Sequence, residues 1–454
     1  MKLIVRITSL FLTSLPLIVV AFANGYPLVF PDTGVYIEQA LSLKGDSSRP
    51  PYYSLFILPF HLGKSLWPIV FIQSFLLTFV LYLSTRVLFG SPPKLTYLTI
   101  VLTFLVMFTS VGWHASQIMP DLFTAVLVLC IYLLVFGWKE LSRLERSAVW
   151  LMLIVAIMFH YGNLPLVLAL GTFALLLLWW QAEPWSAIVR AFVVFAGAAS
   201  IAAVAFVAYS VAYTGKATLS PDGARFALGR LIEDGTAIAY IKRSCPNSGY
   251  ALCRYVESLK ADTNWFLWDA ASPWGNIERE LGFYGARTEA KEIIRGTLET
   301  YPYTQALASI QNAFAQLGMF SIVNSIYPCL GDARVNQVIA RHFQGEHRQF
   351  AASRQNTSTL PLTMIQLLHG ATMVISLLVL LLYVIHPWFR YRRSPSLRSR
   401  SLMFLSILLA ALYINAAICG ALAGPVDRYQ GRLAWLLVFA AIVLLIPPQT
   451  RLPE

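Results

Sequence analysis

Residues 361–386 read PLTMIQLLHGATMVISLLVLLLYVIH. This run contains no Asp, Glu, Lys or Arg, and it exceeds the roughly 18 apolar residues that a membrane-crossing helix needs. Because lipid offers no partner for a free backbone amide, such a run must form a helix. Similar runs recur along the 454-residue chain, which is 57% hydrophobic and only 12% charged. A soluble domain has about 25% charged residues, so the sequence predicts an all-α polytopic membrane protein.

The apolar runs predict about ten transmembrane helices. We place them at residues 5–23, 66–89, 95–111, 120–137, 147–161, 164–180, 189–211, 361–386, 401–420 and 433–447. Residues 52–64 are apolar but contain Pro59, His61 and Lys64, which favours an interfacial or re-entrant helix. The chain then divides into an N-terminal membrane module (1–211), a polar insert (212–360) and a C-terminal membrane module (361–454).

Basic residues predict which side of the membrane each loop faces. The loop 386–400, HPWFRYRRSPSLRSR, has five arginines and no acid, and short cytoplasmic loops carry such an excess. The loops 112–119 and 162–163 have no Lys or Arg. The N-terminus is therefore expected in the cytoplasm, with residues 24–65 and the insert outside. This bias also explains the net charge of +12 without a nucleic-acid partner.

The insert is expected to be a folded, mostly helical, extracytoplasmic domain. Its acidic and basic residues nearly balance, and aromatic residues such as Trp265, Trp268 and Trp274 are frequent, unlike in a disordered linker. Cys245 and Cys253 flank the polar segment PNSGYAL, and a disulfide there is expected if the insert faces an oxidising compartment. These cysteines are not expected to bind a metal, because no further Cys or His residues follow them at the spacing of metal ligands.

Several ionisable residues gather at the outer side of the predicted membrane. Such groups are costly at a membrane edge, so each is a candidate for function. A carboxylate can take a proton from an acceptor hydroxyl, and an arginine can hold a phosphate in bidentate fashion. The candidates predict a site for an anionic, lipid-linked substrate, and they are Asp32, Arg49, Asp121, His160, Asp427, Arg428 and Arg432.

Three of these features occur in an order that resembles a known group of enzymes. Asp32 soon after the first helix, the basic Arg49-Pro50-Pro51 motif later in the same loop, and Met-Pro-Asp121 opening the fourth span together resemble the GT-C superfamily of membrane glycosyltransferases. The nearest branch is family 39-like, with protein mannosyltransferases and the lipid A aminoarabinose transferase. The resemblance covers roughly residues 5–180 and, through Arg428-Tyr429, the last span.

The resemblance implies a reaction and a place for it. Enzymes of this group take a sugar from a polyprenyl phosphate on the extracytoplasmic side, here the periplasmic face of a bacterial inner membrane. The acceptor would be a glycan, a lipid or a protein. By resemblance Asp32 is the catalytic base and Asp121 the second acid, whereas the donor phosphate and substrate would be bound by Arg49, Tyr52, Tyr53, His160, Arg428 and Arg432.

The first outer loop departs from the family pattern at its acid. Many relatives have paired acids there, whereas Asp32 is followed by Thr33-Gly34. One monodentate carboxylate rarely holds a divalent ion alone, so no metal ligand is assigned and a divalent metal stays an open alternative.

Each candidate residue also has an ordinary structural interpretation. Asp32 could cap a helix that begins at Thr33, and Asp121 could favour a helix N-terminus through the helix dipole. Arg49 could be a snorkelling side chain in a turn. His160 could be a hydrogen-bonded interfacial residue, and Tyr52 and Tyr53 could belong to the aromatic belt at the interface.

Three other functions are compatible with a polytopic chain of this kind. A lipid-linked oligosaccharide ligase or polymerase would use basic residues of the insert, here Arg341, His342, His347 and Arg348. A transporter or flippase would show inverted repeats and charges near mid-membrane, neither of which we find. A non-catalytic assembly subunit would use the insert to bind a partner protein.

Overall fold

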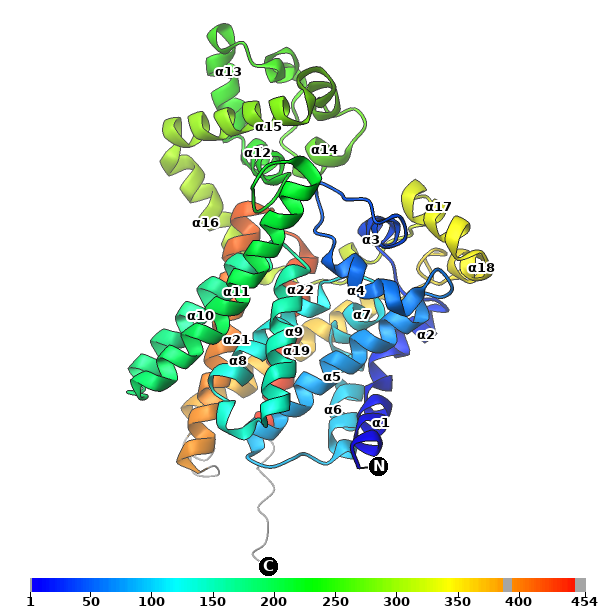
Figure 1. Cartoon of the computed structure of the whole chain (residues 1–454), viewed down its shortest axis with the longest axis vertical. Coiled ribbons are helices and arrows are strands. Elements are labelled where there is room, and N and C mark those ends of the chain that lie inside the picture. Colours follow the sequence, from blue (N-terminus) through cyan, green and yellow to red (C-terminus); the bar gives the residue numbers. More distant parts are fainter. Residues whose placement is uncertain (1, 387–393, 446–454) are drawn as a thin grey trace, which may run out of the picture. The chain divides into compact units, whose positions relative to one another are not determined.

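The computed structural model describes residues 2–386 and 394–445, and these residues form helices without a single strand (Figure 1). One isolated parallel bridge joins Leu28 to Gln117. This confirms the all-helical class that the apolar runs predict. Arg390, Arg392 and Arg393 of the basic loop, and the chain beyond residue 445, lie outside the described residues.

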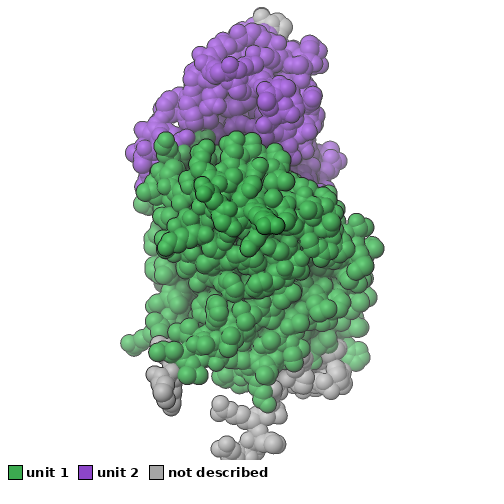
Figure 2. Space-filling view, turned by 90° about the vertical axis from the view of Figure 1, so that its right-hand side faces the viewer, with its two compact units in different colours: residues 1–205, 320–414, 427–454 green, residues 206–319, 415–426 purple. Residues whose placement is uncertain are grey.

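The chain folds into two compact units, which Figure 2 colours separately. Unit 1 comprises residues 1–205, 320–414 and 427–454, and unit 2 comprises residues 206–319 and 415–426. The helices of unit 1 are α1 (Lys2–Ser14), η1 (Leu15–Ile18), α2 (Val19–Asn24), α3 (Pro31–Ser42), α4 (Tyr52–His61), α5 (Trp67–Phe89), α6 (Leu95–Phe108), α7 (Val111–Ser116), α8 (Leu122–Val135), η2 (Trp138–Glu140), α9 (Arg143–Met158), α10 (Asn163–Trp180), η4 (Val323–Ser325), α17 (Ala333–His342), α18 (Gln344–Ala352), α19 (Leu362–Ile385) and α22 (Asp427–Leu445).

Unit 2 is helical as well. Its helices are α12 (Gly223–Glu233), α13 (Thr236–Ser248), η3 (Ala251–Ser258), α14 (Thr263–Trp268), α15 (Trp274–Thr300) and α16 (Pro302–Gly318). Two long helices, α11 (Trp185–Thr214) and α21 (Pro395–Leu422), begin in unit 1 and end in unit 2. A disulfide between Cys245 and Cys253 links the last turn of α13 to η3.

Seven helical segments of the described chain are long and apolar enough to cross a membrane, the pattern of a multi-pass membrane protein. They are Ile4–Asn24, α5, α10, α11, α19, α21 and α22. Helices α6 and α8 are apolar but shorter. The apolar residues 52–64 form the separate short helix α4, which contains Pro59 and ends at His61.

The predicted insert is divided between the two units. Its part up to Met319 folds as unit 2, whereas the part from Phe320 onward belongs to unit 1. The cause is direct packing of α17 on α3, which Figure 1 shows side by side. A Cβ added at Gly34 would lie 3.0 Å from the backbone nitrogen of Val335, so a larger residue would crowd this approach of the two helices. The last part of the insert therefore covers the helix that carries Asp32.

Candidate functional site

The first outer loop is fixed next to the start of α8 by backbone pairing. The amide of Leu28 donates to the carbonyl of Ser116, and the amide of Ile118 donates back to Leu28, at 2.9 Å each. Thr33 extends this pairing, because its hydroxyl donates to the carbonyl of Ile118 at 2.9 Å. These bonds bring the chain around Asp32 next to the chain that leads into Asp121.

Helix α3 begins at Pro31 and not at Thr33. A proline is well suited to the first helical position, where its missing N–H costs nothing. The hydroxyl of Thr33 accepts from the amide of Phe30 at 2.9 Å, so Thr33 takes part in capping the helix start. The interpretation of Asp32 as the N-cap is therefore wrong. Asp32 lies within the first turn, and its carboxylate accepts a 2.7 Å hydrogen bond from Arg49.

The start of α22 supplies two arginines to the same place. Asp427 anchors this start, since its carboxylate accepts from the amide of Ser321 at 2.9 Å and from the side chain of Asn324 at 2.7 Å. Arg428 and Arg432 follow, four residues apart and hence on one face of the helix. The guanidinium of Arg428 also lies 4.2 Å from the centre of the Phe30 ring, a cation–π contact.

Five charged side chains form a continuous chain of ion pairs in unit 1, which we call the arginine–aspartate cluster: Arg49, Asp32, Arg428, Asp121 and Arg432. Nitrogens of Arg428 lie 3.9 Å from an oxygen of Asp32 and 3.7 Å from an oxygen of Asp121. Arg432 donates to Asp121 at 3.2 Å. Charges of opposite sign thus alternate along the whole cluster, which lessens the cost of burying them.

The two ends of the cluster differ in access to solvent. The side chains of Asp32 and Arg49 are each 15% exposed, whereas those of Asp121 and Arg432 are 4% and 2% exposed. Arg428, at 10%, joins the two ends. Its Nε and Nη1 atoms are buried without a hydrogen-bond partner, because both carboxylates lie too far away for a hydrogen bond. A buried donor of this kind is well suited to an anionic ligand.

Burial and neighbouring charge act in opposite directions on Asp32. Burial by itself would raise the pKa of this carboxyl, but the positive charges of Arg49 and Arg428 outweigh it and hold the pKa below its ordinary value. In return, Asp32 outweighs the burial of Arg49 and raises the pKa of its guanidinium. Asp32 is therefore ionised at neutral pH, and Arg49 stays charged beside it.

Two histidines lie near the inner end of the cluster. His160 follows α9, interacts electrostatically with Asp121 and Arg432, and accepts at Nδ1 from the amide of Gly162 at 3.1 Å. His114 in α7 is buried, which lowers the pKa of its imidazole to about 4. Its Nδ1 atom has no hydrogen-bond partner. His114 is thus neutral at physiological pH and adds no charge to the cluster.

The tyrosines predicted as ligands have structural partners. The hydroxyl of Tyr52 donates to the carbonyl of Ala205 at 2.6 Å. Tyr53 is fully buried, and its hydroxyl donates to the side chain of Gln73 at 2.5 Å. Its ring packs edge-on against Tyr36 at 5.0 Å between centroids, behind the cluster.

Sequence reasoning missed three residues at the site: Tyr36, His114 and Tyr327. Tyr36 interacts electrostatically with four members of the cluster, which are Arg49, Asp32, Asp121 and Arg428. Its signal was present in the sequence, because it follows Asp32 by four residues and so shares its helix face. Tyr327 comes from the end of the insert, packs against Phe30 at 5.4 Å and interacts with Arg428. No local pattern could have placed it there.

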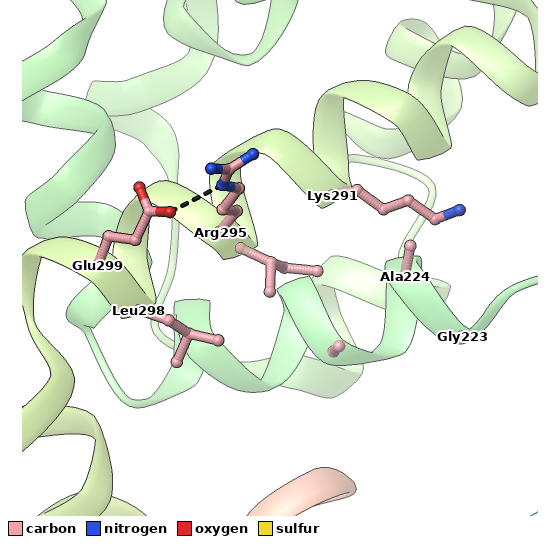
Figure 3. A pocket seen from close by; sticks show the side chains of 8 residues that line it. Gly223, Ala224, Lys291, Arg295, Leu298 and Glu299 are labelled. Carbon is pink, nitrogen blue, oxygen red and sulfur yellow. Dashed lines mark hydrogen bonds and ion pairs between the residues drawn. The ribbon is translucent and has the colours of Figure 1, made fainter.

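Other possible sites lie apart from the cluster in the described chain. Residues 2–386 and 394–445 contain no group of three or more His, Cys, Asp or Glu side chains that could hold a metal ion. Arg341, His342 and Arg348 are exposed on α17 and α18, and His347 is hydrogen-bonded to Asn336 at 2.8 Å. A shallow pocket of about 600 Å³ belongs to unit 2, between α12 and α15 (Figure 3). Its floor is apolar, and at its edge Arg295 pairs with Glu299.

The arrangement offers a carboxylate near solvent and arginine donors that are not fully used. Such a site can accept a proton at Asp32 while it holds an anion at Arg428.

No protein-family model, curated protein or solved structure matched the chain.

Proposed function

We propose that this protein is a membrane glycosyltransferase that moves one sugar from a polyprenyl phosphate to an acceptor on the periplasmic side of a bacterial inner membrane. The observation that carries the proposal is Arg428, a buried arginine held between Asp32 and Asp121 with two nitrogens that make no hydrogen bond. The order of motifs that resembles the GT-C superfamily supports the same activity.

The charge of the arginine–aspartate cluster fits a phosphodiester. Three guanidinium groups and two carboxylates leave one positive charge in a nearly buried site. A polyprenyl phosphosugar carries a single negative charge on its phosphate, so its binding would make the site neutral. Because an uncompensated buried charge is costly, this neutralisation favours a ligand of that charge.

The proposed reaction is a single inverting displacement. The acceptor hydroxyl attacks the anomeric carbon and forms the new C–O bond, while the bond to the phosphate oxygen breaks and its electron pair leaves with the phosphate. The hydroxyl proton passes to Asp32. The phosphate gains a second negative charge as it leaves, and Arg428 has donors available to stabilise this charge, with Arg49 beside it.

The two acids would have different roles in this reaction. Asp32 is at the more exposed end of the cluster, where an acceptor can reach it. Asp121 is 4% exposed and has arginines on both sides, which suits a residue that positions Arg428 and Arg432. The neutral state of His114 keeps a further positive charge away from the site.

Contacts at the opposite loops support the proposed ten crossings and the cytoplasmic N-terminus. Charged residues from loops predicted to be cytoplasmic pair with each other: Arg86 donates to Glu145 at 2.8 and 2.7 Å, and Arg400 pairs with Glu140. The cluster, in contrast, combines residues only from loops and helix ends predicted to be outside. The disulfide in unit 2 favours an oxidising compartment for that unit.

A transfer assay with a matched pair of variants tests the proposal. Membranes that contain the full-length protein are incubated with radiolabelled undecaprenyl-phosphate sugars, and loss of label from the carrier lipid is measured. Asp32→Asn should fold and insert normally but lose nearly all transfer. Glu38→Gln, which changes an exposed carboxylate on the same helix, should transfer at the normal rate.

Other outcomes would identify a different function. Normal transfer by Asp32→Asn would exclude this residue as the base. Turnover only with diphosphate-linked oligosaccharides would point to a ligase or polymerase. Movement of the intact lipid across the membrane, without cleavage, would point to a flippase.

A further inference from the structure

Helix α16 of unit 2 exposes large apolar side chains along one face. Tyr303, Leu307, Ile310 and Phe314 are 90%, 56%, 53% and 70% exposed. Their spacing of three or four residues places them on a single stripe of the helix. In the described part of the chain, α16 is therefore an amphipathic helix whose apolar side is turned outward.

The inward face of α16 is polar and is held by specific hydrogen bonds. Gln305 and Asn312 donate to the carboxylate of Asp234 at 2.8 and 2.9 Å. The side-chain amide of Gln316 exchanges two hydrogen bonds, of 2.9 and 2.8 Å, with the backbone of Val426. Rotation of the helix to hide its apolar stripe would break these four bonds, so the outward orientation is fixed by the fold.

The same helix packs against the end of a candidate membrane span. A Cβ added at Gly420 of α21 would lie 2.7 Å from the backbone nitrogen of Ala313, so the two helices are in backbone contact, as Figure 1 illustrates. The final turns of α21 and α11, which both qualify as spans, lie in this unit and expose Leu422 (58%) and Val211 (46%). The apolar stripe of α16 thus belongs to a helix that packs against the end of a candidate membrane span.

The composition of α16 indicates what covers the stripe. Residues 302–318 include no Asp, Glu, Lys, Arg or His. Interfaces with soluble proteins have a polar or charged rim, whereas a surface against hydrocarbon needs none. Tyr303, at the N-terminal end, is a residue type enriched at the level of the lipid headgroups.

We propose that the outward face of α16 is embedded in a phospholipid bilayer and anchors unit 2 to the membrane, together with the ends of α11 and α21. The stripe Tyr303–Leu307–Ile310–Phe314 contacts acyl chains, and the Gln305–Asn312–Gln316 face contacts unit 2. This inference is independent of the proposed transferase activity.

Spin labelling of the full-length protein in vesicles of phosphatidylethanolamine and phosphatidylglycerol tests this surface. Nitroxide labels are attached to Leu307→Cys and Phe314→Cys, and their collision rates with molecular oxygen and with a water-soluble nickel chelate are compared. Arg295→Cys is the control, because this side chain is 80% exposed on α15 of the same unit. The native free cysteines Cys130, Cys329 and Cys419 are buried, and the labelled unsubstituted protein gives their background.

The expected result is an oxygen-to-nickel ratio severalfold higher at residues 307 and 314 than at residue 295. A ratio equal to that of the control would place the stripe in water and overturn the proposal. Low collision rates with both reagents would also overturn it, because they would mean that a protein surface covers the stripe. The two labelled sites replace exposed side chains and are measured independently, so misfolding of one variant leaves the other as a test.

Discussion

Arg432 donates a 3.2 Å hydrogen bond to Asp121, although the two residues are 311 positions apart in the sequence. Their side chains are 2% and 4% exposed. This pair joins the second turn of α22 to the residue that precedes α8, so the last candidate span of the described chain and the motif Met-Pro-Asp121 share one buried contact. A charge so deeply buried depends on its partner for compensation.

Asp121→Asn should destabilise the protein strongly. The substitution removes the carboxylate that pairs with both Arg428 and Arg432, and breaking a buried ion pair costs about 3–5 kcal/mol. The measurement is the midpoint of thermal unfolding in detergent, with Glu38→Gln as the control for loss of an exposed acid. The double variant Asp121→Asn/Arg432→Gln should recover much of the loss. An unchanged midpoint for the single variant would contradict this account of the pair.

Arg49→Gln should move the acid limb of the pH–activity profile to higher pH. In the proposed reaction the lowered pKa of Asp32 keeps this residue ionised, so transfer should be flat between about pH 5 and 8. Without Arg49, burial becomes the stronger influence and raises the pKa of Asp32. A step near pH 6.5 in the native profile would instead indicate that a histidine controls the activity. His114 is not expected to produce such a step, because burial lowers its pKa to about 4.

The same carboxyl should make folding stability depend on pH. A pKa that is lower in the folded than in the unfolded protein gives stabilisation above the unfolded value, about 4 for Asp. This stabilisation is lost as the pH falls through the folded pKa. As the pH is lowered from 7, the midpoint of thermal unfolding should fall less for Asp32→Asn than for the native protein. If the midpoints of the two proteins fell equally with pH, the result would contradict a stabilising ion pair between Asp32 and Arg49.

Gly34→Ala should crowd the contact between α17 and α3 and lower the stability of the protein. The new Cβ would lie 3.0 Å from the backbone of Val335, which cannot move aside as a side chain can, and a cost of about 1–3 kcal/mol is typical of such overpacking. Gly275→Ala is the matched control, because a Cβ there meets nothing within 4 Å. The midpoints of thermal unfolding of the two variants are compared. Equal midpoints would show that α17 shifts to accommodate the new Cβ without loss of stability.

Cys245 and Cys253 should resist alkylation in protein taken directly from cells. Their disulfide can persist only in an oxidising compartment, so protection of both cysteines supports the predicted sidedness of unit 2. Mass spectrometry of peptides after alkylation, with and without prior reduction, measures this protection. Two fully alkylated cysteines without reduction would place the unit in the cytoplasm.

Apolar periodicity allowed most of the fold to be predicted, but not the grouping of its parts. The helix over residues 361–386 is observed as α19, Leu362–Ile385, because a long uncharged run has no other structure in lipid. The division of the insert at residue 320 was not predictable. It accompanies the packing of α17 on α3, where Gly34 meets the backbone around Val335, and a glycine in a helix carries no sign of which distant backbone it approaches.

The sequence alone determined the helical class, the candidate spans and the charged residues Asp32, Arg49, Asp121, Arg428 and Arg432, because these follow from local composition and from the cost of charge near lipid. Only the tertiary structure decided that Arg428 lies between both acids with unused donors, that Tyr53 is bonded to Gln73, and that Tyr327 reaches the site. The reason is physical. Helix formation depends on neighbours in the chain, whereas the pairing of charges depends on which distant helix ends the packing brings together.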